Sequence, residues 1–294
     1  MMVSDGIELF LRLYPAYLLV EFVLRPGFCG ADRFRNSWRS RSLILHAVAA
    51  GGLTFLFAAL WDIVFMLQNP ASLPAMLPQL RNALLYAFVL VAASHFAIDG
   101  ALARWTAGRR EKTSRGGDPG LLPEDDSLRT LFAGGAAHLG VLFIVLVLLS
   151  PQAPIPYPFA GPVELIRIWV AAISFLLVLQ PGGMLVGGVI RSWRDDADAF
   201  QEGSLDKAGR LIGYVERVLV VTFILVNQYT AIGFFIAAKG LFRINDPKRS
   251  EYIIVGTLVS FAIAVLIGAA AAYLIYQGGI EQCIEYLSEL LQIS

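Results

Sequence analysis

Eight long apolar runs dominate this chain and restrict the folds that it can adopt. An α-helix needs about 20 mostly apolar residues to cross a bilayer, and seven of the runs reach or approach that length. The runs cover residues 7–25, 43–67, 80–105, 128–149, 163–190, 210–226, 229–242 and 252–276. The seventh is short, and the sequence Pro181-Gly182-Gly183 predicts a bend within the fifth.

Composition supports a membrane protein. The chain is 57% hydrophobic and 16% charged, whereas soluble domains contain about 25% charged residues. We therefore expect an all-α, polytopic transmembrane helix bundle that forms a single domain over residues 1–294. The 23 basic and 23 acidic residues balance, so the net charge provides no electrostatic case for binding nucleic acid.

The distribution of Lys and Arg predicts the orientation. Twenty of the 23 basic residues flank alternate connections between the runs, and only Arg12, Arg81 and Arg167 lie toward the other side. Because basic connections stay in the cytoplasm, we expect eight segments with both termini outside, in a bacterial inner membrane.

Two polar segments have separate interpretations. Residues 106–127 are charged and rich in glycine and proline, which is typical of a flexible cytoplasmic loop. Residues 278–294 combine an apolar stripe with three glutamates, and this pattern predicts an amphipathic acidic helix on the outer face. That helix is the expected docking element for a membrane-protein partner, while lipids surround the bundle.

The three histidines of the chain all fall inside predicted spanning helices. His95 and Asp99 are four residues apart and so share one helical face. The two other histidines are His46 and His138, and the first run contributes Glu21. Ionisable groups inside a membrane cost free energy and mark functional or paired positions. Counting residues from the helix ends places all five side chains where they can converge in the cytoplasmic half.

Three roles are open for these five residues. They can hydrogen-bond one another and join the helices. They can hold a divalent metal, since histidine and carboxylate ligands suit zinc, manganese or iron. They can also line a path for a proton or a ligand.

A second polar group lies toward the C-terminus. It consists of charged residues near the predicted cytoplasmic surface, namely Glu216, Arg217, Lys239, Arg243 and Glu251. Mutual ion pairing is the default interpretation because unpaired charges at that depth are costly. An anion site, for example for a lipid phosphate, is the alternative.

Several motifs are distributed over most of the chain. The first half contains short motifs at residues 16–26 (AYLLVEFVLRP), 45–47 (LHA), 94–99 (SHFAID) and 134–138 (GGAAH), and the second half contains longer blocks at residues 209–217, 228–243 and 251–261. In these residues the chain resembles the uncharacterised bacterial integral-membrane family catalogued as domain of unknown function 3307. Tyr17 stands where the family motif has histidine, and Gly134-Gly135 replaces an Asp-Gln pair. The resemblance implies the membrane fold and the candidate residues, and it implies no reaction.

A further motif match is weaker. Residues 99–104 (DGALAR) fit the DGxxAR core of the CDP-alcohol phosphotransferases. That family needs additional aspartates at helical spacing, and Phe96 occupies the first of those positions here. One aspartate does not build a dinuclear metal site.

These observations favour a non-enzymatic function, in which the protein is an accessory or scaffold subunit of a membrane complex. The alternative is a membrane-embedded metal-dependent hydrolase or transferase acting on a lipid or phosphate-bearing substrate. In that case His46, His95, Asp99 and His138 hold the metal and Glu21 is a ligand or base. A small-solute transporter is a third option. The sequence leaves open whether the protein is an enzyme.

Overall fold

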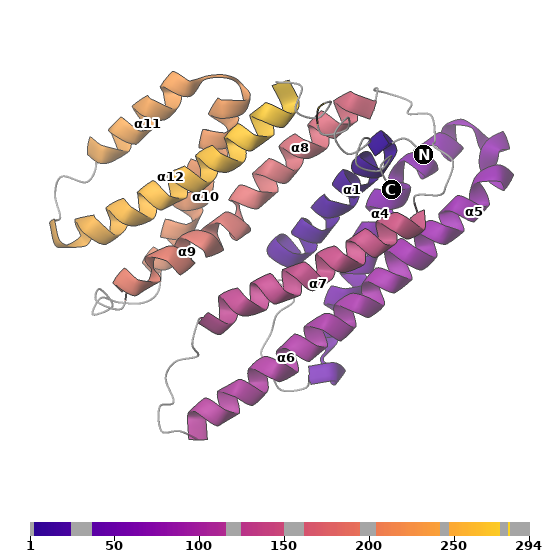
Figure 1. Ribbon diagram of the computed structural model, residues 1–294, viewed down its shortest axis with the longest axis horizontal. Helices are drawn as coiled ribbons and strands as arrows, with labels where there is room; N and C mark the ends of the chain where they lie inside the picture. Colours follow the sequence, from indigo (N-terminus) through magenta and orange to yellow (C-terminus); the bar gives the residue numbers. More distant parts are fainter. Residues whose placement is uncertain are drawn as a thin grey trace. The chain divides into compact units, whose positions relative to one another are not determined.

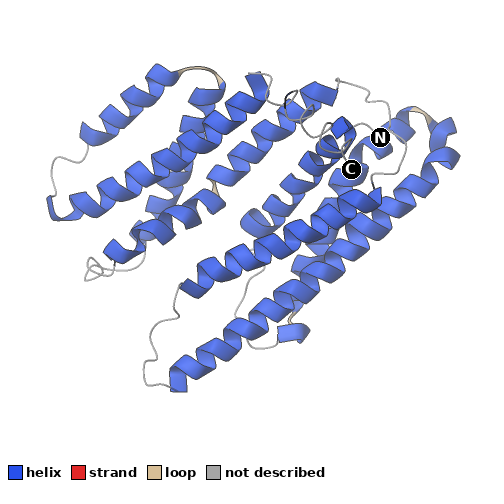
Figure 2. Cartoon of the chain, viewed as in Figure 1, coloured by secondary structure: helices blue, strands red, loops and turns tan. Residues whose placement is uncertain are grey.

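The computed structural model describes residues 3–24, 37–115, 125–149, 162–194, 204–241 and 247–276, together with Gln282. These residues are helical apart from short turns (Figure 2). The all-α prediction is therefore confirmed for the described part of the chain. The chain divides into two compact units, Met1–Ile166 and Arg167–Ser294, and the expected single membrane domain stays a prediction.

The N-terminal unit is a helix bundle. Helix α1 (Val3–Leu18) continues as the π-helical segment η1 (Leu19–Leu24), and the short 3-10 turn η2 (Ser37–Arg39) precedes α4 (Arg41–Gln68). The turn η3 (Pro70–Ser72) leads to α5 (Leu73–Ala83), the π-helical segment η4 (Leu84–Leu90), α6 (Val91–Arg115) and α7 (Asp125–Leu149). Helix α4 packs against α1 and α6, while α7 packs against α1 and α6 (Figure 1). Four helices thus enclose one interior.

The C-terminal unit contains the end of α8 (Pro162–Val178), then α9 (Gln180–Arg194), α10 (Ser204–Leu225), α11 (Tyr229–Leu241) and α12 (Pro247–Tyr276). Helix α12 packs against both α10 and α9. The contact between α10 and α12 is apolar and includes Val220, Ile224 and Phe261. Gly268 permits this approach, because a Cβ there would lie 2.7 Å from Ile224 Cδ1.

Four stretches of helix in the described residues are long and apolar enough to cross a membrane: Arg41–Leu60, Met76–Gly108, Phe132–Leu149 and Val255–Tyr276. The pair Ile166–Val178 and Gln180–Val189 adds a fifth if it forms one bent span. The protein is therefore a multi-pass membrane protein. The expected eight segments and their topology stay a prediction. Helix α11, with 13 residues, is about 20 Å long, which is shorter than the hydrocarbon core.

The bend predicted in the fifth run is confirmed. Helices α8 and α9 meet at Leu179 with an angle of 40°. Pro181 explains the break because it has no backbone N–H and its ring crowds the preceding turn.

The two polar segments have different outcomes. Residues 106–115 belong to α6, which extends to Arg115, so this part of the predicted loop is helical. Arg, Glu and Lys are good helix formers, and the helix continues through the single Gly108 up to the residue before the Gly116-Gly117 pair. Residues 116–124 lie outside the described residues. The predicted tail helix at 278–294 also lies outside them, except for Gln282, whose Oε1 accepts a hydrogen bond of 2.7 Å from Tyr273.

Candidate metal centre

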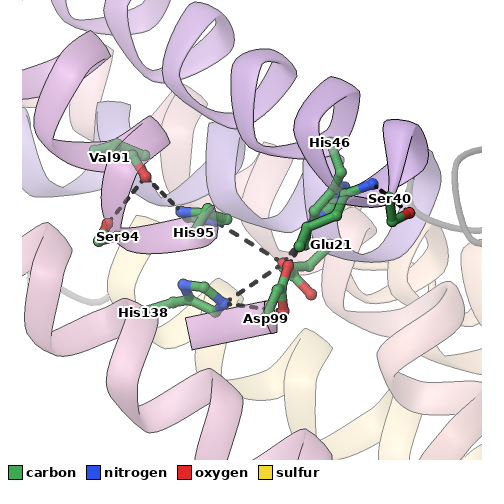
Figure 3. A network of polar contacts seen from close by, with 9 residues as sticks. Glu21, Ser40, His46, Val91, Ser94, His95, Asp99 and His138 are labelled. Atoms are coloured by element: carbon green, nitrogen blue, oxygen red, sulfur yellow. Dashed lines mark hydrogen bonds and ion pairs between the residues drawn. The ribbon is translucent and has the colours of Figure 1, made fainter. Parts of the chain in front are cut away.

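The five polar residues singled out in the N-terminal half lie together inside the first unit (Figure 3). Glu21 comes from η1, His46 from α4, His95 and Asp99 from α6, and His138 from α7. Their exposed fractions are between 0% and 4%. We call these five residues the histidine–carboxylate cluster. Their convergence, which helix periodicity predicted, is present in the structure.

Local backbone features bring these side chains together. Glu21 lies in a π-helical segment, a form that is rare and often found at functional sites. A second π-helical segment, η4, directly precedes the helix that carries His95 and Asp99. Gly51 allows α4 to contact this region closely, since a Cβ at Gly51 would lie 2.9 Å from Ala92 Cβ. This close contact places the helix of His46 beside the helix of His95.

Glu21 is the centre of the cluster. Its Oε1 lies 3.1 Å from His46 Nε2, 3.8 Å from His138 Nε2 and 3.9 Å from His95 Nε2. Asp99 approaches two of the same rings, with Oδ2 3.3 Å from His46 Nε2 and Oδ1 3.7 Å from His138 Nε2. All three imidazoles therefore direct Nε2 toward a carboxylate.

Hydrogen bonding defines which nitrogen of His95 carries the proton. His95 Nδ1 lies 3.1 Å from the carbonyl oxygen of Val91, and a carbonyl only accepts hydrogen bonds. Nδ1 is therefore the donor, so Nε2 of the neutral ring carries a lone pair. That lone pair faces Glu21 Oε1, which is also an acceptor. Two acceptors that face each other inside a protein require a cation between or beside them.

His138 shows the same deficit. Neither of its ring nitrogens has a hydrogen-bond partner within the described residues, and the same holds for His95 Nε2. The two rings stack with centroids 3.9 Å apart and planes inclined by 24°. Two positively charged imidazoles at this separation would repel each other strongly. Protonation of both rings is therefore an unfavourable way to satisfy them.

The cluster has the dimensions of a metal site. Two sets of ligand atoms lie within 4.8 Å of one another: Glu21 with His95 and His138, and Glu21 with His46 and Asp99. Ligand atoms bound tetrahedrally to zinc at 2.0–2.1 Å are about 3.3 Å apart. The spacings of up to 4.8 Å exceed this value, so the ligand atoms would approach one another by up to about 1.5 Å on binding zinc.

The C-terminal polar group is arranged differently. Glu216 and Lys239 form an ion pair, as the ion-pairing interpretation expects. Arg217 instead donates from Nε to the carbonyl of Val178, from Nη2 to that of Leu179 at 3.0 Å, and from Nη1 to Ser260 Oγ at 3.0 Å. Arg243 and the side chain of Glu251 lie outside the described residues.

The sequence analysis did not identify the roles of Arg217 and Trp38. Arg217 donates to helix carbonyls at the break before Pro181. The available signal was Pro181 itself, because a helix break leaves carbonyls that need donors. In the N-terminal unit, the Trp38 indole packs directly on Gly100, beside Asp99. A glycine within an otherwise regular helix was the available signal for such a close contact.

The chemistry of the histidine–carboxylate cluster follows from its donor set of three imidazoles and two carboxylates. Such a set could hold a divalent transition metal or exchange protons. No protein-family model, curated protein or solved structure matches this chain.

Proposed function

We propose that this multi-pass membrane protein binds one divalent transition-metal ion in its N-terminal unit. Glu21, His95 and His138 are the proposed ligands, with Asp99 as a fourth. The observation that carries the proposal is the lone pair of His95 Nε2 facing Glu21 Oε1 at 3.9 Å in a buried site. A metal ion resolves this contact by accepting electron pairs from both atoms.

Charge supports a single ion. Two ionised carboxylates and three neutral imidazoles carry a charge of −2, which one divalent cation neutralises. A second divalent ion would leave an excess positive charge in a buried site, which is costly. His46, which donates to Glu21 Oε1 at 3.1 Å, then orients the carboxylate, as outer partners of metal ligands commonly do. Zinc, manganese and iron all accept this mixture of ligands.

Within this proposal, an accessory or scaffold role has the stronger support. The ligands come from three helical elements, so one ion would link η1, α6 and α7, while His46 ties α4 to the site through Glu21. Their side chains are at most 4% exposed, as is typical of closed structural metal sites. A structural ion of this kind would stabilise the N-terminal unit as a platform for a partner.

A metal-dependent hydrolase or transferase is the second candidate. Two histidines and one glutamate form the ligand set of several catalytic zinc sites, and the π-helical segment at Glu21 is of a type frequent at functional sites. A lipid or another phosphate-bearing molecule stays the proposed substrate class. The transporter alternative gains no support from the described residues. Four further points also stay proposals. They are the location in an inner membrane, the outward termini, a partner docked on residues 278–294 and membership of the resembled family.

Elemental analysis of the purified protein in detergent tests the metal site. Wild type is compared with His95→Ala and with Thr106→Ala, a matched control on the same helix whose hydroxyl bonds only the carbonyls of Leu102 and Ala103. We expect about one metal ion per chain in wild type and in Thr106→Ala, and near-complete loss in His95→Ala. Wild type that stays metal-free after equilibration with zinc, manganese and iron would overturn the proposal. Turnover of a phospholipid that His95→Ala abolishes would favour the enzyme over the scaffold.

A further inference from the structure

Trp38 occupies a boundary position beside the histidine–carboxylate cluster. It belongs to η2, which packs against both α4 and α6. A Cβ placed on Gly100 would lie within 3.0 Å of three indole carbons, so the ring rests directly on the backbone of α6. Gly100 is the residue that follows Asp99. The indole therefore covers the helix where a cluster carboxylate emerges.

A second aromatic contact holds the indole over the same helix. Trp38 and Phe96 have ring centroids 5.5 Å apart, and Phe96 directly follows His95. Trp38 thus contacts α6 at the two positions that follow cluster residues.

The exposed fraction differs sharply between Trp38 and the cluster residues. Trp38 is 37% exposed, whereas the cluster residues are between 0% and 4% exposed. Behind it, Ser40 is fully buried, and its Oγ accepts a hydrogen bond of 3.3 Å from the backbone N–H of Leu43. This cap anchors the start of α4, one turn before His46. Trp38 is thus an exposed side chain that packs on α6 at the positions next to two buried cluster residues.

We propose that the Trp38 indole closes the entrance to the cluster, and that ions and small reagents reach the three histidines when it moves aside. The contacts of the ring with Gly100 and Phe96 are dispersion contacts, which are individually weak. Rotation of this side chain therefore costs less free energy than separation of the hydrogen-bonded helix ends. Trp38 sits where an interfacial aromatic residue is favourable, with one side apolar and one side exposed.

Histidine modification provides a direct test. The chain contains three histidines, and all three belong to the cluster, so their total reactivity with diethyl pyrocarbonate reports access to it. Mass spectrometry of the detergent-purified protein measures this rate for wild type, Trp38→Ala and Gly100→Ala. Trp105→Ala is the matched control, because Trp105 lies on α6 and is 42% exposed.

We expect Trp38→Ala and Gly100→Ala to react on the order of tenfold faster than wild type, the factor that corresponds to about 1.4 kcal/mol. Trp105→Ala should react at the wild-type rate. Size-exclusion chromatography checks folding, and Trp38→Ala decides the outcome if Gly100→Ala does not fold. A Trp38→Ala rate equal to wild type, or an equal acceleration in Trp105→Ala, would overturn the proposed entrance.

Ion passage at Trp38 rests on the proposed metal site, but histidine shielding does not. Metal-free protein with Trp38-dependent reactivity would refute the metal site and support the entrance. Protein that binds metal but whose histidine reactivity does not depend on Trp38 would support the metal site and refute the entrance. In metal-loaded samples, extraction by a chelator should show the same order of rates among the variants.

Discussion

The two units of this protein bury polar groups in opposite ways. In the C-terminal unit, the Arg217 guanidinium donates to the carbonyls of Val178 and Leu179 and to the Ser260 hydroxyl. In the N-terminal unit, the lone pair of His95 Nε2 faces Glu21 Oε1. Donors meet acceptors around Arg217, whereas an acceptor meets an acceptor between His95 and Glu21.

The difference distinguishes a polar group that only stabilises the fold from one that needs a ligand. A buried polar group that lacks a partner costs about 1–3 kcal/mol, so a set that is matched internally stabilises the fold without a ligand. Arg217 has that character, because it satisfies the carbonyls freed by the break between α8 and α9. The cluster has an internal deficit of positive charge, so it is complete only with protons or a metal ion.

Arg217→Met should have the largest effect on stability. The substitution removes the Arg217 donors to the carbonyl of Val178 and the hydroxyl of Ser260, while the carbonyl of Leu179 keeps the backbone N–H of Gly183. We expect a cost of about 3 kcal/mol. Thermal unfolding in detergent measures this, with Arg210→Met as the control because Arg210 lies on the same helix and is exposed. Unchanged stability in Arg217→Met would show that the hydrogen bonds of Arg217 do not stabilise the C-terminal unit, and the contrast with the histidine–carboxylate cluster would then fail.

Asp99→Ala should cost about 2 kcal/mol in the metal-free protein, more than a typical surface substitution. It removes the acceptor 3.3 Å from His46 Nε2 in a position that is fully buried. Calorimetry or a thermal-shift measurement in detergent reads out the change. A melting temperature equal to that of wild type would argue against Asp99 as a buried partner of His46.

Lys239→Met should cost about 1 kcal/mol, because it leaves Glu216 without its ion-pair partner in a partly buried position. The double variant Glu216→Gln/Lys239→Met should recover part of the loss, since the unpaired charge is then gone. Chemical unfolding of wild type, Lys239→Met, Glu216→Gln and the double variant measures the coupling between the two residues. Full additivity of the two substitutions would show that the pair contributes nothing.

Glu21→Gln should have the smallest effect on metal-free stability and should abolish metal binding. The amide can donate to the lone pair of His95 or His138 while its oxygen still accepts from His46, so we expect a change near zero or a slight gain. Unfolding of metal-stripped protein gives the sign, and elemental analysis gives the metal content. A loss of several kcal/mol without metal would identify the cluster as a self-sufficient hydrogen-bonded structure.

Much of the fold was predictable from the pattern of apolar residues. All eight apolar runs overlap helices in the structure, and the bend at Leu179 lies where Pro181 predicts it. The extension of α6 to Arg115 was missed because glycine and proline later in the segment suggested a loop throughout. The two compact units depend on packing between helices that are distant in sequence, and such packing leaves little trace in local composition.

Residue type and spacing alone determined the helical membrane class and placed the five cluster residues on buried helical faces. They did so because hydrophobic length and the 3.6-residue period are local properties. Only the tertiary structure decided which atoms face each other: that His95 Nδ1 donates to Val91, that Arg217 meets the break at Leu179 and that Trp38 rests on Gly100. These contacts depend on the register and rotation of packed helices, which the sequence of one helix does not encode.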